Sequence, residues 1–139
     1  MGESDQYLEI WNYTEKGYKP LVFSAGWQVA LLNWEPLFDL EKLCEIERHN
    51  QTDEVFVLWK GNAALFVNTA DGMRVEDMQP GVIYNVPRGV WHNLVSTRDA
   101  SWIIVEDRNT HLLDTEIRTM SVNEMADLKT NLPPWIEGG

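Results

Sequence analysis

The stretch PGVIYNVPRGVWHN, residues 80–93, combines two turn signals, two short apolar runs and one histidine. PG at residues 80–81 and PRG at residues 87–89 supply the fixed φ of proline and the conformational freedom of glycine, which tight reversals require. The run VIYNV between them is rich in β-branched and aromatic residues, as strands are. The stretch therefore predicts turn, strand, turn and a further strand that opens with His92.

Similar turn sequences recur along most of the chain. Turn sequences such as KGN at residues 60–62 and DG at residues 71–72 separate the apolar runs, and DG suits a two-residue hairpin. The runs are LVFSAGWQVALLNW, KLCEIE, EVFVLW, AALFV, VIYNV, HNLVS and SWIIVE. Such regular spacing of short runs predicts an antiparallel sandwich or barrel.

The tail of the chain changes character. Ser121 and Glu124 have the spacing of a capping box, and Met120 can pack against Met125 as a hydrophobic staple. We therefore expect a short helix over about residues 122–129, packed on the outside of the barrel. A loosely attached tail is the alternative.

The composition indicates one domain. The chain has 139 residues, of which 44% are hydrophobic, and this is enough apolar material for one core. We expect a single domain over residues 1–139, with the core barrel at about residues 20–108 and the helical tail at about residues 119–139.

The charge balance restricts the partners. The chain has 11 basic and 22 acidic residues, so its net charge of -11 repels phosphate backbones and anionic membranes. No apolar run approaches the roughly twenty residues that cross a bilayer, and the start MGESDQYLEI lacks the pattern of a secretory signal. Cys44 is the single cysteine and cannot form an internal disulfide. We expect a cytoplasmic protein that binds neither nucleic acid nor membrane.

A second stretch, ERHNQTDE at residues 47–54, supplies metal-ligand chemistry. Glu47 and His49 lie two positions apart, so on an extended strand both side chains project from the same face. After a short bend, Glu54 can return a carboxylate to the same place. Imidazole and carboxylate bind iron(II), manganese, nickel and zinc. His92 offers a second histidine from the start of another strand.

Together the two stretches resemble the two sequence motifs of the cupin superfamily. The first family motif reads H-x-H, then three or four residues, E, six residues and G. Here Glu54 and Gly61 reproduce the interval between E and G, and His49 takes the second histidine position. Glu47 stands where the family has its first histidine, and Glu41 stands where the family has a leading glycine.

The second family motif is the more specific half of the resemblance. It reads G, five residues, P-x-G, two residues, H, three residues and N. Gly81, Pro87, Gly89 and His92 match it, whereas Ser96 replaces the final asparagine.

The resemblance covers roughly residues 40–106. It implies an all-β fold, an antiparallel double-stranded β-helix or jelly-roll barrel with a short C-terminal helix, and a site in the barrel mouth. It implies His49, Glu54 and His92 as ligands of a divalent metal, either Fe, Mn, Zn or Ni. Glu47, where it does not coordinate the metal, would be the base that transfers a proton. The alternative is that the exchanged histidine records loss of the metal, with Arg98 or Arg108 neutralising the acids.

Other residues are also candidates for the pocket. Glu106 shares the parity of apolar residues in SWIIVE, and Tyr84 is the better inward candidate of the pair Tyr84 and Asn85, so Tyr84 and Glu106 are expected to line the pocket. His111 follows the last clear strand and is expected in a surface loop, outside the ligand set. Trp91 should face away from His92.

The expected function follows from the resemblance. It implies a metal-binding cupin acting on a small polar molecule, a sugar or an oxo or hydroxy acid, with isomerase or epimerase chemistry preferred. An iron(II) dioxygenase and a non-catalytic binding module without metal are the alternatives, so enzyme activity stays open. The apolar segment LVFSAGWQVALLNW favours a homodimer formed by adding strands to a partner's sheet. A monomer with this segment on its own sheet is the other possibility.

Overall fold

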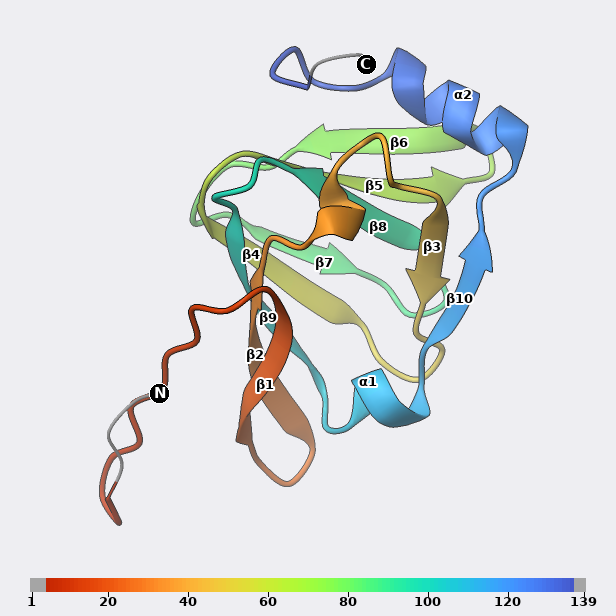
Figure 1. The fold of residues 1–139 in the computed structure, drawn as a ribbon. Helices are drawn as coiled ribbons and strands as arrows, with labels where there is room; N and C mark the ends of the chain where they lie inside the picture. The colour runs from red at the N-terminus through yellow and green to blue at the C-terminus, as the bar shows by residue number, and fades with distance from the viewer. Residues whose placement is uncertain (1–4, 137–139) are drawn as a thin grey trace.

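The computed structural model describes residues 5–136, and these residues build two facing antiparallel sheets (Figure 1). In hydrogen-bonded order, the first sheet contains β1 (Gly17–Phe23), β2 (Trp27–Asn33), β9 (Ser101–Asp107), β4 (Glu54–Lys60) and β7 (Ile83–Val86). The second contains β10 (Glu116–Thr119), β3 (Glu45–Arg48), β8 (His92–Ser96), β5 (Ala63–Thr69) and β6 (Gly72–Asp77). Within residues 5–136, three short helices accompany the sheets: η1 (Pro36–Phe38), α1 (Thr110–Leu113) and α2 (Val122–Thr130). The predicted all-β antiparallel barrel with a short C-terminal helix is confirmed.

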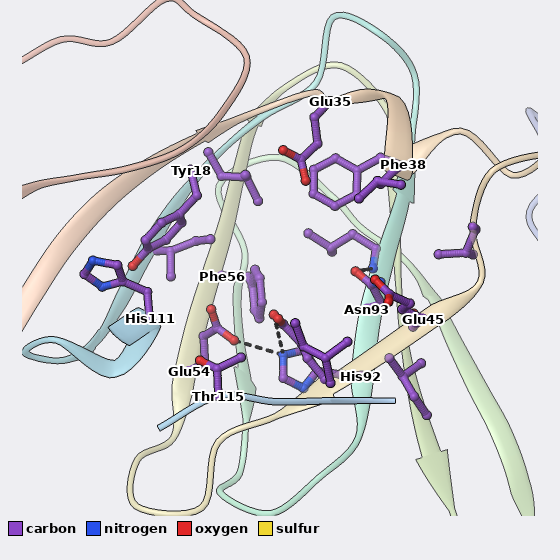
Figure 2. Close-up of a pocket in the computed structure, with 18 of the residues that line it drawn as sticks. Tyr18, Glu35, Phe38, Glu45, Glu54, Phe56, His92, Asn93, His111 and Thr115 are labelled. Carbon is purple, nitrogen blue, oxygen red and sulfur yellow. Dashed lines mark hydrogen bonds and ion pairs between the residues drawn. The ribbon is translucent and has the colours of Figure 1, made fainter. Parts of the chain in front are cut away.

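The strand registers gather polar side chains at one end of the barrel. In the first sheet Gln28 of β2 pairs with Glu106 of β9, and all three of Gln28, Glu54 and Glu106 are buried. In the second sheet Glu47 of β3 pairs with His92 of β8. Because side chains alternate along a strand, these residues share the inner face with the apolar residues of the core. A cavity opens at this end (Figure 2).

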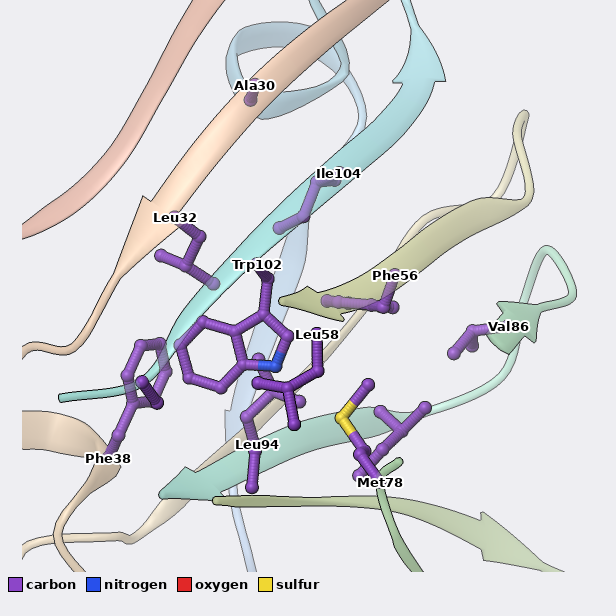
Figure 3. Packing of buried hydrophobic residues seen from close by; sticks show 13 residues of the cluster. Ala30, Leu32, Phe38, Phe56, Leu58, Met78, Val86, Leu94, Trp102 and Ile104 are labelled. Carbon is purple, nitrogen blue, oxygen red and sulfur yellow. The ribbon is translucent and has the colours of Figure 1, made fainter. Parts of the chain in front are cut away.

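The other end of the barrel is filled with hydrocarbon. Trp102 is fully buried and packs edge-to-face on Phe38 of η1 with 5.5 Å between ring centroids. Leu32 and Leu58 lie beside it from neighbouring strands (Figure 3). This packed end fixes the strands whose other ends carry the polar groups.

The C-terminal helix covers the outside of the second sheet, as predicted. Ser121 Oγ accepts a hydrogen bond from the backbone N–H of Glu124 at 3.1 Å, and the Glu124 carboxylate accepts one from Ser121 N–H at 2.9 Å. Leu128 is fully buried in a second apolar cluster that includes Met120 and Met125. The capping box thus starts a helix that packs against the barrel through its apolar side.

Several boundaries differ from those expected. The segment LVFSAGWQVALLNW lies in two strands, β1 and β2, which pair with each other, and β2 also pairs with β9 of the same sheet. In the hairpin near DG the two loop residues are Ala70 and Asp71, while Gly72 pairs with Thr69 as the first residue of β6. Strand β10 extends the second sheet beyond residue 108. Over the described residues, no helix is long and apolar enough to span a membrane.

Candidate metal centre

Four side chains from three strand ends meet in the cavity. Glu47 lies on β3, His49 directly follows that strand, Glu54 opens β4 and His92 opens β8. Each offers one ligand atom, and these four atoms lie within 4.8 Å of one another. His49, Glu54 and His92 are buried, whereas the Glu47 side chain is 35% exposed towards the cavity.

The two imidazoles converge on one carboxylate oxygen. Nε2 of His49 and Nε2 of His92 each lie 2.9 Å from Glu54 Oε1 (Figure 2 shows Glu54 beside His92). Their other ring nitrogens are already used: His49 Nδ1 donates to the carbonyl of Asp114 at 2.8 Å, and His92 Nδ1 donates to that of Val90 at 2.9 Å. Each ring therefore presents only its Nε2 to Glu54.

This arrangement fits a bound divalent cation. A neutral imidazole that donates from Nδ1 has a bare lone pair on Nε2, and two such lone pairs facing a carboxylate oxygen repel it. Either both rings carry an extra proton, or a cation lies among the three groups. Two nitrogen lone pairs and a carboxylate are the ligands that iron, manganese, zinc and nickel accept. A divalent cation would also balance the charges of Glu47 and Glu54.

Glu47 completes the cluster from a slightly greater distance. Its Oε1 lies 3.8 Å from His92 Nε2 and 4.0 Å from His49 Nε2, compared with 2.9 Å for Glu54. Its strand pairs it with His92 across the sheet, which brings the two side chains to the same face. The carboxylate that replaces the first histidine of the family motif therefore lies beside the other three groups.

The charges in the cluster depend on one another. Burial alone would raise the pKa of Glu54, but its hydrogen bonds with His49 and His92 lower it to about 2. Burial alone would lower the pKa of His49, whereas the hydrogen bond and charge of Glu54 raise it to about 9. The pKa of Glu47 is raised by burial and then by the negative charge of Glu54. Without a metal, protons must therefore hold this cluster together.

A second polar group lines the same cavity. The Tyr18 hydroxyl donates to Glu106 Oε2 at 3.0 Å, and Gln28 Nε2 donates to that hydroxyl at 2.9 Å. Gln28 Nε2 also lies 3.1 Å from Nδ1 of His111. Burial, followed by the charge of Glu54, raises the pKa of Glu106 to about 8. These residues connect the wall of the cavity to the cluster of Glu47, His49, Glu54 and His92.

The residues for which the sequence predicted a place inside or outside the pocket differ in outcome. Glu106 lines the cavity as expected. Tyr84 does not, because it lies on β7 at the edge of its sheet, where its ring packs on the core and its hydroxyl accepts a hydrogen bond from the backbone of Gln79. His111 was expected in a surface loop and instead lines the cavity from helix α1.

The two arginines that could neutralise the acids in place of a metal lie elsewhere. Arg98 pairs with Asp39 at 3.3 Å, and Arg108 donates to the backbone carbonyl of Ser24. Among the described residues that line the cavity there is no arginine. Trp91 lies against Arg48, with 4.6 Å between the guanidinium carbon and the ring centroid, and is absent from the cavity lining as predicted.

Sequence reasoning missed Tyr18 and Gln28. Gln28 had a detectable signal, because it alternates with Ala30 and Leu32 along WQVALLN and must share their buried face. A buried amide on an otherwise apolar strand face needs polar partners. Tyr18 gave no such signal, since its contact with Glu106 joins positions 88 residues apart.

Comparison with solved structures identifies the architecture. A cupin-2 domain protein from Shewanella frigidimarina is 23% identical, with a TM-score of 0.51 over 68% of this chain and 85% of its own. KdgF from a Halomonas species is 15% identical, with a TM-score of 0.50 over 75% of this chain and 92% of its own. The chain has the cupin fold. No family model matches the sequence, and no curated protein sequence is similar to it.

A larger cupin fold is also similar. The oxalate decarboxylase of Bacillus subtilis, whose structure was studied for its Mn(II) centres, is 16% identical and has a TM-score of 0.51 over 68% of this chain. The similar region spans only 26% of the decarboxylase chain. At these identities the cupin likeness concerns the fold, and the metal-binding capacity of this chain is argued from its own cluster.

Proposed function

We propose that this cupin is an enzyme that binds a divalent metal through His49, Glu54 and His92 and transfers protons on a small oxygen-bearing molecule, as isomerases and epimerases do. The observation that carries the proposal is the convergence of two Nε2 atoms on Glu54 Oε1 at 2.9 Å, with both Nδ1 atoms held by backbone carbonyls. Rings held in this way are preorganised for a metal.

The cavity gives this centre a place to act. The cluster lines a cavity of about 330 Å³, which lies within the size range of small-molecule sites. When bound, a divalent metal supplies Lewis acidity, which polarises a substrate carbonyl or hydroxyl and stabilises negative charge. His49, Glu54 and His92 are the residues that would hold it, and the packing of Phe56 against His92, with 5.8 Å between ring centroids, keeps one imidazole in place.

Glu47 is the group that we assign to proton transfer. Its carboxylate is the least buried of the cluster and faces the cavity, while Glu54 is fixed by two imidazoles. Burial and the charge of Glu54 raise the pKa of Glu47 in the metal-free cluster, and a carboxylate in this position can act as a general base. The proton that it removes from a carbon next to the carbonyl returns to the same carbon or to a neighbouring atom. The molecule therefore gains and loses no atoms.

An iron(II) dioxygenase is the second candidate. The observation that favours it is the ligand set itself, because two histidines and one carboxylate with Glu47 further away match the facial triad of non-haem iron oxygenases. Consumption of dissolved oxygen with an added substrate would distinguish it from an isomerase.

Elemental analysis tests the metal site. Protein purified without a metal-affinity tag is compared with the Glu47→Ala and His92→Ala variants. We expect about one metal per chain in the unmodified protein, loss of the metal in His92→Ala and retention in Glu47→Ala. Metal-free protein after incubation with Fe(II), Mn(II), Zn(II) and Ni(II) in turn would contradict the proposal.

Hydrogen exchange tests the proton transfer. In D₂O, the metal-loaded protein should catalyse exchange of the carbon-bound hydrogens next to the carbonyl of 2-oxopentanoate, followed by NMR. Glu47→Gln should lower the exchange rate by about 100-fold or more, since a general base contributes this much. Glu45→Gln is the matched control, because Glu45 also lies on β3 and lines the cavity but is not in the cluster. Equal rates in both variants would exclude Glu47 as the base.

A further inference from the structure

The cavity beside the cluster is walled mainly by hydrocarbon. We define the apolar wall by six lining residues from both sheets and η1: Leu32, Leu37, Phe38, Phe56, Leu94 and Ile104. All of them except Leu37 are buried. Figure 2 shows Phe38 well separated from His92, so the wall extends away from the cluster. A hydroxyl placed against such a wall loses its hydrogen bonds with water and gains none.

The polar group formed by Tyr18, Gln28 and His111 has few free hydrogen bonds to offer. The Gln28 carbonyl accepts from the backbone N–H of Asn109 at 2.9 Å, which identifies its Nε2 as the donor to Tyr18 and His111. The Tyr18 hydroxyl in turn donates to Glu106. His111 Nδ1 must therefore accept, and in the neutral ring the proton lies on Nε2. These three side chains therefore have little hydrogen-bonding capacity left for the hydroxyl groups of a sugar.

The charges of the lining restrict the ligand further. Five glutamates line the cavity: Glu35, Glu45, Glu47, Glu54 and Glu106. Among the lining residues Lys42 is the only lysine or arginine. A ligand with a second negative group away from the metal would therefore approach five carboxylates with Lys42 as the single compensating cation among the described lining residues.

We propose, on the basis of the function proposed above, that the substrate is a monoanionic or neutral molecule with an oxygen-bearing head group at the metal and a hydrocarbon body on the apolar wall. A 2-oxo or 2-hydroxy acid with an alkyl or aryl body has this chemistry. Sugars and dicarboxylates do not. The head group lies at His49, Glu54 and His92, and the body lies towards Phe38 and Leu94.

Binding of a homologous series tests the substrate class without any turnover. The probes are pyruvate, 2-oxobutanoate, 2-oxopentanoate, 2-oxohexanoate and 2-oxooctanoate, titrated by calorimetry into the Zn(II)-loaded protein. Each added methylene should tighten binding roughly threefold to fourfold, because this is the gain from burying one methylene. The matched dicarboxylate 2-oxoglutarate has the same carbon number as 2-oxopentanoate and should bind at least about tenfold more weakly.

Two leucine variants locate the body of the ligand. Leu37 lines the cavity and is 51% exposed, so Leu37→Asp should fold and should weaken 2-oxooctanoate binding by about tenfold or more. Leu113 is 80% exposed and is not in the lining, so Leu113→Asp adds the same charge elsewhere and should bind like the unmodified protein. Equal affinities of the two variants would overturn the assignment of the body to the apolar wall.

The separate titration of Zn(II) distinguishes the two proposals. If the protein binds zinc but affinity does not increase along the series, or if 2-oxoglutarate or gluconate binds as tightly as 2-oxopentanoate, the substrate class is wrong while the metal site stands. If zinc itself does not bind, the proposed function fails and the substrate class fails with it.

Discussion

In each histidine of the cluster, Nδ1 donates a hydrogen bond to a backbone carbonyl. This hydrogen bond fixes the ring so that Nε2 faces Glu54. His49 Nδ1 depends on the carbonyl of Asp114, whose carboxylate also accepts hydrogen bonds from the backbone N–H groups of Asn50 and Gln51. One residue thus orients the imidazole and holds the bend between β3 and β4. Loss of such an outer contact normally lowers metal affinity by about tenfold to 100-fold.

The pH dependence of metal affinity is the first prediction at this scale. Without metal, the pKa of His49, which burial alone would lower, is raised from 6.5 to about 9 by Glu54, so the ring carries a proton at neutral pH. A metal must displace this proton. Affinity for Zn(II) should therefore rise about tenfold or more per pH unit from about pH 6 to about pH 8 and level off above about pH 9. Calorimetry in buffers of different ionisation enthalpy measures the released protons.

The stability of the metal-free protein should change in the opposite direction. Because the folded-state pKa of His49 is raised, its stabilising contribution is complete below the ordinary value of 6.5 and is lost as pH rises through about 9. Thermal unfolding of the metal-free protein should therefore shift to lower temperature over this range, while the metal-bound protein changes less. His111→Gln should keep both trends, because His111 is outside the cluster. A pH-independent affinity would contradict the proton-held cluster.

The sequence predicted those site residues whose side-chain direction follows from local spacing along a strand or next to a turn. Glu47, His49 and Glu54 lie within eight positions, and His92 was recognised from the turn before it. His111 could not be placed, because its position depends on a hydrogen bond to Gln28, 83 residues away. The short helix that carries it, THLL, has no side-chain cap and no apolar period from which it could be predicted.

At the scale of elements, the glycines of the two cupin-like motifs, Gly61 and Gly81, have different structural roles. Gly61 ends the first motif after β4 with a φ of 79°, and an added Cβ would lie 2.6 Å from Ala100 Cα. Gly81 begins the second motif with nearly the same φ, 80°, but an added Cβ would meet nothing within 4 Å. Both positions require a left-handed backbone, and only Gly61 also requires the absence of a side chain.

This difference gives a matched pair of substitutions. Gly81→Ala should lower the free energy of unfolding by about 1 to 2 kcal/mol, which is the cost of a left-handed conformation for alanine. Gly61→Ala should add a further loss of about 1 to 3 kcal/mol, because the backbone at Ala100 must move. Urea unfolding followed by tryptophan fluorescence measures both values. Equal losses would show that the turn, and not the close approach to Ala100, explains the glycine at position 61.

Local signals also explain which elements could be predicted. Helix α2 was found because its capping box lies within four consecutive residues. Strand β10 was not found, because EIRT is mostly exposed and pairs only with β3, nearly seventy positions earlier: Glu116 pairs with Arg48. An edge strand of this kind has no apolar alternation, so it forms only because β3 offers it backbone hydrogen bonds.

At the scale of the whole molecule, the first sheet is apolar on both faces. The inner face forms the core and the cavity, and two outer rows run across neighbouring strands. One row is Val29, Val105 and Val55, and the other is Leu31, Ile103, Val57 and Ile83. These side chains stay partly or fully exposed, and Ile83 is 71% exposed. A continuous apolar surface of this kind is typical of a protein interface.

The predicted homodimer can be tested on this surface. The segment expected to join a partner's sheet lies in its own sheet, so we now place the dimer contact on the outer rows. Light scattering should give twice the 16.1 kDa chain mass for the unmodified protein. Val57→Glu should give monomers, because a carboxylate in the centre of an apolar interface loses its hydration. Val122→Glu is the matched control and should stay dimeric, because Val122 is 85% exposed on α2, outside these rows. A monomeric unmodified protein, or a dimeric Val57→Glu variant, would show that the outer rows do not join two copies.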